Sequence, residues 1–133
     1  MDNLSVELKP EIKTYDIDIA GHVNNIAYVR WFEDLRTKFF NTYINLRDLL
    51  SNNFYPVVIS TDINYKKSLR LFDKPVGIMS IECFNHGIIV LKTEIKINGK
   101  IAAYGKQKCA LMNLKTCKMD KGKMKSILEN IKT

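Results

Sequence analysis

The stretch from Tyr15 to Tyr43, YDIDIAGHVNNIAYVRWFEDLRTKFFNTY, contains the clearest change of pattern in this 133-residue chain. In its second half, large apolar residues recur at steps of three and four, which places them on one face of a helix: Tyr28, Phe32, Leu35, Phe39 and Tyr43. The spacing predicts an amphipathic helix over residues 25–43. Further apolar residues widen that face, so we expect the helix to be covered on more than one side: Ile26, Val29, Trp31 and Phe40.

Both flanks of this helix are typical of strands. Residues 5–19 mix alternating and extended character, with Pro10 marking an edge or a break, and we expect a strand there. After a loop around residues 51–53, apolar and polar residues alternate from Val57 to Tyr65. Three further strands are predicted over residues 75–84, 88–97 and 100–113.

Turn residues indicate how these strands connect. Asn98-Gly99 is typical of a tight hairpin, because both residues readily adopt the positive φ angles of a type I′ turn. The element order is then strand, long helix and a four-stranded antiparallel meander, followed by a short helix over about residues 122–132. Since the long helix is the only element large enough to cover the apolar face of the sheet, we predict an α+β fold in which the sheet wraps around it.

Length and composition favour a single domain over residues 1–133, with its core at about residues 5–117. No apolar run approaches the roughly 18 residues of a membrane helix, and the acidic start MDNLSVELKP is unlike a signal peptide. We therefore expect a soluble cytoplasmic protein without a membrane partner. The cysteines Cys83, Cys109 and Cys117 lack metal-type spacing and are interpreted as reduced structural thiols, so no metal site is predicted.

The net charge of +7 favours encounter with acidic partners, such as phosphate-bearing small molecules or an acidic carrier protein. An ordinary solvated surface explains the charge equally well, because the lysines are spread along the chain. No zinc-ligand pattern or aromatic RNA-binding strand accompanies them, so we do not predict a nucleic-acid partner.

Polar groups gather just before the predicted helix. The segment from Asp16 to Asn25 holds two carboxylates, an imidazole and two amides. A helix N-terminus offers unpaired N–H groups that can bind a carbonyl oxygen as negative charge develops on it, while a nearby carboxylate attacks that carbonyl or activates water. If this segment is a strand, Asp16 and Asp18 point to the same side. The alternative is structural: Asn24 is well placed to cap the helix, and Gly21 suits a sharp turn.

The run Asp16-Ile17-Asp18-Ile19-Ala20-Gly21-His22-Val23-Asn24-Asn25, with Tyr28, Trp31, Glu33 and Arg36, resembles the motif of hotdog-fold acyl-CoA thioesterases. These are the 4-hydroxybenzoyl-CoA thioesterase-like enzymes and the related acyl-carrier-protein thioesterases. The resemblance implies a hotdog fold and hydrolysis of an acyl-CoA or acyl-carrier-protein thioester without a metal or organic cofactor. It also implies a homodimer or homotetramer.

The same resemblance implies roles for individual residues. Asp18 matches the nucleophile or general base of the family, and Asp16 is given a structural role. His22 matches the histidine of the acyl-carrier-protein branch, although Ala20 replaces that branch's asparagine, and Asn25 stands where the short-chain acyl-CoA branch has a histidine. The predicted substrate-binding residues are Gly21, Val23, Asn24, Tyr65, Lys66 and Arg70, and the N–H groups near Val23 to Asn25 are expected to polarise the carbonyl.

Some neighbouring residues are interpreted as structural. For Glu33, an ion pair with Arg30 or Arg36 is favoured over a second active-site carboxylate. Tyr28, Trp31 and Phe32 are assigned to core packing, and Cys109 to a buried thiol. His86 is assigned no role.

Two other functions fit the same fold, namely a hotdog hydratase or dehydratase and a non-catalytic acyl-thioester binder. Hydratase relatives generally separate their aspartate and histidine more widely than the three residues between Asp18 and His22, which favours hydrolysis.

Overall fold

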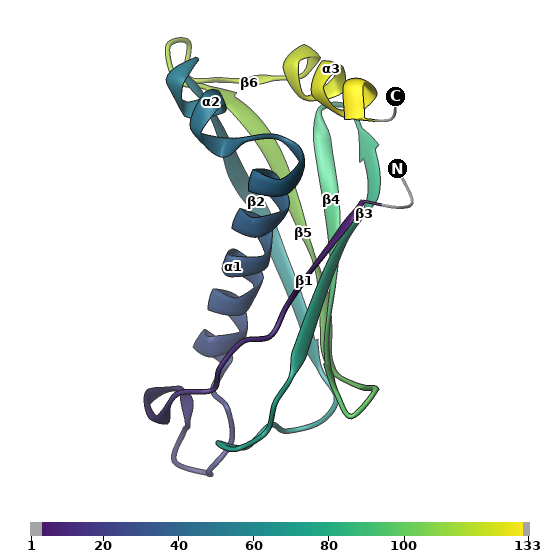
Figure 1. Cartoon of the computed structure of the whole chain (residues 1–133). Helices are drawn as coiled ribbons and strands as arrows, with labels where there is room; N and C mark the ends of the chain where they lie inside the picture. Colours follow the sequence, from purple (N-terminus) through teal and green to yellow (C-terminus); the bar gives the residue numbers. More distant parts are fainter. Residues whose placement is uncertain (1–3, 132–133) are drawn as a thin grey trace.

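The structure, a computed structural model, describes residues 4–131 and consists of a curled antiparallel sheet with one long helix against it (Figure 1). Three other helical segments are short. The elements in chain order are β1 (Ser5–Leu8), η1 (Thr14–Asp16), α1 (Asn25–Tyr43), α2 (Leu46–Ser51), β2 (Phe54–Tyr65), β3 (Val76–Asn85), β4 (Ile88–Ile97), β5 (Lys100–Asn113), β6 (Lys118–Asp120) and α3 (Gly122–Ile131).

Helix α1 has the predicted bounds, and its predicted apolar face points into the core. Phe32, Leu35 and Phe39 have no exposed surface, and Tyr28 is 3% exposed. Burying each such side chain contributes roughly 1.5–3 kcal/mol. The expectation of cover on more than one side is wrong for Ile26 and Val29, which remain 65% and 48% exposed because no element within residues 4–131 packs over that side.

Strands of the sheet are ordered β1-β3-β4-β5-β2, and β6 extends the sheet beside the end of β5. The predicted four-stranded meander is therefore wrong for β2. Strands β3, β4 and β5 form a meander, but residues 66–75 carry the chain from β2 across to β3, and β2 pairs with β5 instead. Gly105 in β5 permits this pairing, because a Cβ there would lie 1.9 Å from the Asp62 carbonyl oxygen of β2.

The first predicted strand is shorter than expected. Strand β1 ends at Leu8, and residues 9–13 run irregularly into the single turn η1. Ile17 then forms an isolated antiparallel bridge with Val23. The prediction of one strand over residues 5–19 is wrong because Pro10 lacks an N–H for the ladder and the Asp16 side chain accepts a hydrogen bond from its own segment, at Lys13 N.

Local turn chemistry agrees with the sequence. Asn98 and Gly99 have φ angles of 52° and 77°, as the predicted hairpin requires. His86 and Gly87 form a second two-residue turn of the same kind between β3 and β4. Helix α3 covers most of the predicted 122–132 range, of which residue 132 lies outside the described part. Helix α2 and strand β6 had no clear signal, because each is only a few residues long.

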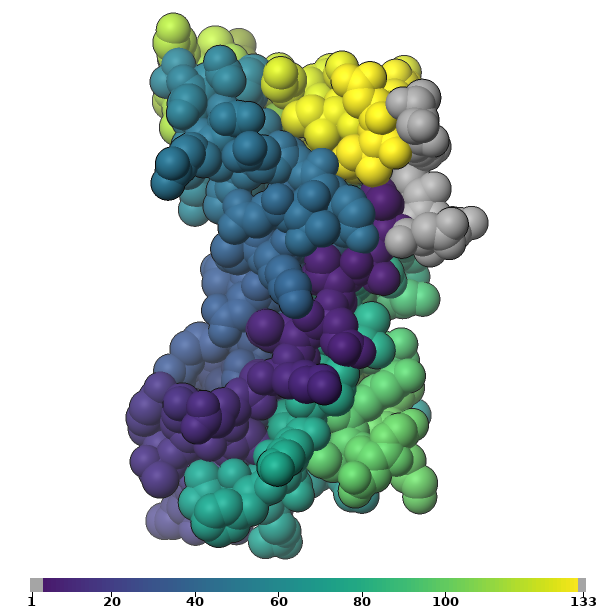
Figure 2. Space-filling model, viewed as in Figure 1, coloured from purple at the N-terminus to yellow at the C-terminus, as the bar shows by residue number. Residues whose placement is uncertain are grey.

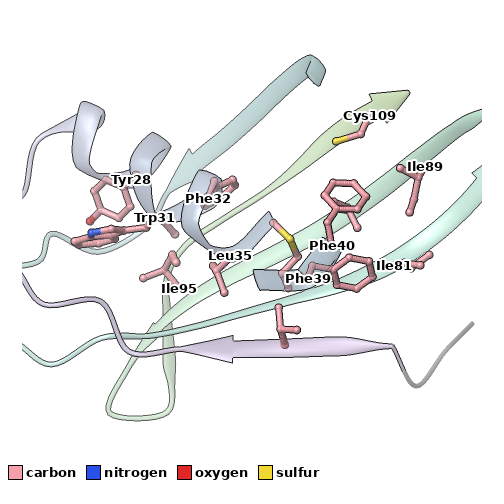
Figure 3. Close-up of a cluster of buried hydrophobic side chains, with 14 of the residues drawn as sticks. Tyr28, Trp31, Phe32, Leu35, Phe39, Phe40, Ile81, Ile89, Ile95 and Cys109 are labelled. Carbon is pink, nitrogen blue, oxygen red and sulfur yellow. The ribbon is translucent and has the colours of Figure 1, made fainter. Parts of the chain in front are cut away.

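The core lies between α1 and the inner face of the sheet. Figure 3 shows the aromatic side chains of α1 beside Ile81, Ile89 and Ile95 of the strands, with Tyr28 and Trp31 at the end of the cluster where the helix begins. None of the helices within residues 4–131 is both long and apolar enough to cross a membrane.

The cysteines differ in accessibility. Cys109 is fully buried, and burial raises the pKa of its thiol to about 11, whereas Cys83 and Cys117 are exposed. All three are free thiols, and the buried-thiol interpretation of Cys109 is confirmed.

We expect Ellman's reagent to modify Cys83 and Cys117 rapidly in the native protein, and Cys109 only after unfolding, because the thiolate is the reactive species and Cys109 is both protonated and enclosed. The Cys109→Ser variant should leave the fast phase unchanged. Loss of amplitude from that fast phase would contradict the predicted packing of β5.

Candidate active site

Several local backbone hydrogen bonds fix the conformation of residues 16–24, which lead into α1. Asp18 N donates to His22 O at 2.8 Å, and Gly21 N donates to Asp18 O at 3.0 Å. Gly21 has a φ of 82°, a conformation that side chains disfavour, and it closes this tight turn. The turn is anchored on both sides, since Val23 N donates to Leu69 O at 2.8 Å and Asn24 N to Asp16 O at 2.7 Å.

The Asp18 carboxylate is held by the same turn. Its Oδ1 accepts hydrogen bonds from Ala20 N at 2.9 Å and His22 N at 3.1 Å. Within residues 4–131 its Oδ2 accepts no hydrogen bond, and the side chain is exposed. One oxygen therefore fixes the orientation of the carboxylate, and the other is available to a ligand or water.

Asp16 has a different environment. Its side chain is buried, Oδ2 accepts from Lys13 N at 2.8 Å, and Oδ1 lies 3.9 Å from the Arg30 guanidinium. Arg30 also lies over the Tyr15 ring, 5.7 Å from its centroid. The expectation that Asp16 and Asp18 point to one side is wrong, because η1 ends at Asp16 and the chain turns before Asp18.

The start of α1 offers free donors. Asn24 caps the helix as predicted, with its Oδ1 accepting from Ala27 N at 2.9 Å. Val23 N and Asn24 N already donate to backbone carbonyls, so these two cannot polarise a substrate carbonyl, contrary to expectation. In the described chain, Asn25 N and Ile26 N have no backbone acceptor, and the partial positive charge of the helix end is centred there.

These groups meet in one open pocket of about 250 Å³ between the start of α1 and the end of β2. The predicted site residues that line it are Asp18, His22, Val23, Asn25, Tyr65 and Lys66. Tyr28, Lys67 and Ser68 also line it, although sequence reasoning assigned Tyr28 to the core and gave Ser68 no role.

Other predicted site residues do not line the pocket. Gly21 forms the turn between Asp18 and His22, and the side-chain oxygen of Asn24 accepts the hydrogen bond that caps the helix. Arg70 is exposed in the connection between β2 and β3, where its backbone N–H donates to Asp73 Oδ2 at 2.8 Å. The structure thus separates residues that build the turn from residues that face the pocket.

Two tyrosines form one wall of the pocket. The rings of Tyr28 and Tyr65 meet edge to face with centroids 5.1 Å apart, and Trp31 contacts Tyr28 in the same manner at 5.2 Å. Burial raises the pKa of Tyr28 to about 12, with the neighbouring Tyr65 and Asp73 adding to the effect. Burial also raises the pKa of Tyr65. Both hydroxyls are therefore protonated at neutral pH.

Glu33 lies outside the pocket and pairs with Arg36, one of the two predicted partners. Arg36 Nη1 also donates to Gln107 Oε1 at 3.3 Å, and Gln107 Nε2 donates to Thr61 Oγ1 at 3.1 Å. This partly buried polar chain links α1 to β5 and β2. Within the described residues, no group of three or more His, Cys, Asp or Glu side chains is placed to share a metal ion.

Comparison with known proteins identifies the family. The model of the thioesterase-like superfamily matches residues 12–130. The chain belongs to the thioesterase-like superfamily. A search of curated proteins finds no match.

Solved structures with the same fold include members from several bacteria. The probable thioesterase YbaW of Escherichia coli is 23% identical, with a TM-score of 0.80 over 97% of this chain and 98% of that one. The DHNA-CoA thioesterase of Staphylococcus aureus is 19% identical, with a TM-score of 0.81 over 96% and 89%. The hypothetical protein SAV2348 of Staphylococcus aureus, solved in complex with CoA, is 14% identical, with a TM-score of 0.82 over 96% and 82%. The predicted hotdog fold is confirmed.

This member of the superfamily also has a larger groove of about 770 Å³, lined mostly by apolar surface, between residues 9–15 and 71–75. Figure 2 shows these two segments side by side at the lower end of the molecule, in purple and teal. Neither Asp18 nor His22 lines the groove, so the smaller pocket is the candidate site.

The raised pKa of Tyr28 predicts a specific loss of stability at alkaline pH. Because the phenolate forms more easily in the unfolded chain, the stabilising contribution is complete below pH 10 and is lost as the pH rises towards 12. Urea unfolding should show that Tyr28→Phe loses less stability than the wild type between pH 10 and pH 12. Equal losses in the two proteins would contradict this assignment.

Proposed function

We propose that the protein hydrolyses acyl-CoA thioesters, releasing a carboxylic acid and free CoA thiol, in the pocket that Asp18 and Asn25 share. One observation carries the proposal: the pocket is lined both by Asp18, whose carboxylate has one oxygen without a partner in the described chain, and by Asn25, whose backbone N–H is free at the helix start. Hydrolysis of a thioester needs both, because one group supplies the nucleophile and the other stabilises the oxyanion.

In the proposed reaction, Asp18 Oδ2 either removes a proton from the attacking water or attacks the thioester carbonyl itself. In the second route the departing thiol leaves an acyl-Asp18 anhydride, which water then hydrolyses to release the carboxylic acid. The Asn25 N–H and the helix dipole stabilise the negative charge that develops on the carbonyl oxygen. Because Ala20 N and His22 N hold Oδ1, the carboxylate needs little reorganisation during the reaction. The proposed role of His22, which lines the same pocket, is to protonate the departing thiolate.

The basic groups at the pocket favour a phosphate-bearing thiol. Lys66 and Lys67 line the pocket, and their backbone N–H groups both donate to Ala102 O, which fixes where the side chains start. Neither ammonium forms an ion pair with a carboxylate of the described residues. CoA and the phosphopantetheine of an acyl carrier protein both carry phosphate that lysine can bind. CoA is the proposed substrate, and carrier-bound thioesters are the comparison in the assay.

We expect Asp18→Asn to lower kcat for acyl-CoA hydrolysis by roughly 100- to 10,000-fold, because an amide is neither base nor nucleophile. The asparagine Oδ1 still accepts from Ala20 N and His22 N, so the thermal midpoint should change little. Thiol release from a panel of acyl-CoA and acyl-carrier-protein thioesters, followed with a thiol-trapping dye, measures the effect.

Asp34→Asn is the matched control, since Asp34 is an exposed carboxylate on α1 that does not line the pocket. A wild-type protein that binds these thioesters and releases no thiol would refute hydrolysis and leave the non-catalytic binder. Repeated turnover in ¹⁸O-labelled water separates the two roles of Asp18, because only nucleophilic attack places solvent oxygen in its carboxylate.

The subunits are proposed to pair through β2. It is a sheet edge of 12 residues, whereas the opposite edge, β1, has only 4. Exposed apolar side chains lie along this strand and on the first turns of α1 near Tyr65: Tyr55, Ile59, Ile26 and Val29. A long edge strand with exposed apolar residues is a template for pairing with a second chain. A homodimer joined at β2 explains both features.

Replacing Ile59, which is 53% exposed at a bulge of β2, with lysine should shift the dimer towards monomer, because a charge at the pairing edge opposes strand addition. Size-exclusion chromatography with light scattering gives the mass. Phe72→Lys is the control, since Phe72 is 89% exposed and lies outside β2. A wild-type monomer at assay concentration, or equal effects of both variants, would exclude this interface.

A further inference from the structure

The Tyr28 hydroxyl is a polar group that the fold does not use. Tyr28 is 97% buried, since only 3% of it is exposed, yet its hydroxyl forms no hydrogen bond with another described residue. Thr93 Oγ1 is the only such unpartnered side-chain atom in the described chain that is sealed from solvent, so the Tyr28 hydroxyl reaches open space. Tyr28 lines the pocket of Asp18, so the open space next to its hydroxyl is assigned to that pocket.

A second tyrosine on the same helix shows the contrast. The Tyr43 hydroxyl donates to Ser5 O at 2.7 Å and accepts from Ser5 N at 3.0 Å, which ties β1 to the end of α1. The Tyr28 hydroxyl has no such partner among the described residues and is left free to bind a ligand.

The position of Tyr28 on the helix directs it towards the reacting group. Tyr28 is three residues after Asn25, so the two occupy the same face of α1, and helical side chains lean back towards the N-terminus. Edge contacts with Trp31 and Tyr65 hold the ring in place. In Figure 3 the hydroxyl oxygen of Tyr28 points away from Phe32 and towards Trp31, at the end of the cluster where the helix begins.

We propose that Tyr28 is a catalytic residue whose hydroxyl donates a hydrogen bond to the thioester carbonyl oxygen, next to the free Asn25 N–H. This inference rests on the proposed hydrolysis. As Asp18 Oδ2 or its activated water adds to the carbonyl carbon, the electron pair of the C=O bond moves to oxygen, where two donors share the charge. When the intermediate collapses, that pair re-forms the C=O bond and the C–S bond breaks to release thiolate. Tyr28 keeps its proton throughout.

The burial that raises the pKa of Tyr28 to about 12 suits this role, because a donor must stay protonated over the working pH range. Tyr65 is a weaker candidate for the same donor. Tyr65 is 48% exposed against 3% for Tyr28, so bulk water competes more strongly for its hydroxyl.

Tyr28→Phe tests the assignment. We expect kcat to fall about 10- to 100-fold and KM to rise only about fivefold, because a hydrogen bond to the bound substrate carbonyl strengthens as charge develops on its oxygen. The thermal midpoint should stay at the wild-type value, since the hydroxyl has no partner among the described residues to lose. Tyr65→Phe is the comparison within the pocket, and Tyr104→Phe, an exposed tyrosine of β5, is the control outside it. Turnover of Tyr28→Phe within about twofold of the wild type would overturn the proposal.

Two unreactive ligands separate this inference from hydrolysis itself. One is a CoA ketone in which a methylene group replaces the sulfur and the carbonyl is kept, and the other is an S-alkyl-CoA without a carbonyl. By isothermal titration calorimetry, Tyr28→Phe should weaken the ketone about fivefold or more and leave S-alkyl-CoA unchanged.

The outcomes are distinguishable. If the wild type releases no thiol but its affinity for the ketone falls in Tyr28→Phe, the proposed hydrolysis is refuted and the hydrogen bond from Tyr28 is supported. If the wild type hydrolyses thioesters, and the variant binds both ligands and turns over thioesters like the wild type, the hydrogen bond from Tyr28 is refuted and hydrolysis is supported. If the wild type binds neither ligand and releases no thiol, both fail.

Discussion

Packing of α1 against the inner face of the curled sheet is the interaction on which the other features depend. Phe32, Leu35 and Phe39 have no exposed surface, and they lie against strands whose inner residues are equally enclosed. A helix of 19 residues with one apolar face is stable only when that face is covered, and the sheet has no other cover of comparable length. The position of α1 in turn decides where its N-terminus lies, and the pocket is built around that end.

Hydrogen bonds within residues 16–24, the segment before α1, fix the geometry of the groups at the helix N-terminus. Backbone bonds from Val23 to Leu69 and from Asn24 to Asp16 tie the segment both to the β2–β3 connection and to η1. Between these anchors the Asp18 side chain closes its own turn through Ala20 N and His22 N. The carboxylate is consequently fixed relative to the helix start, although it lies in a loop and is exposed. Preorganisation of this kind is what a reacting group needs, because less reorganisation then accompanies charge development.

Tyr28 shows how one residue serves packing and the site together. Its ring belongs to the core and contacts Trp31, while the residue also lines the pocket. Periodicity could only report that Tyr28 belongs to the apolar face, and so it was assigned to packing. The motif spacing nevertheless contained the missing signal, since Asn25 and Tyr28 are three residues apart and must share a helix face. A tyrosine at such a position differs from phenylalanine only by its hydroxyl, so the surroundings of that hydroxyl decide its role.

Sequence alone determined what depends on near neighbours: the bounds of α1, its Asn24 cap, the Asn98-Gly99 turn and the motif that marks the family. These are consequences of side-chain periodicity and backbone chemistry within a few residues. Only the tertiary structure decided that β2 pairs with β5, that Val23 N and Asn24 N are already occupied, and that Arg70 lies away from the pocket whereas Tyr28 lines it. Each of those facts depends on contacts between residues that are distant in sequence and come together only when the sheet packs around the helix. Local sequence patterns do not specify such contacts.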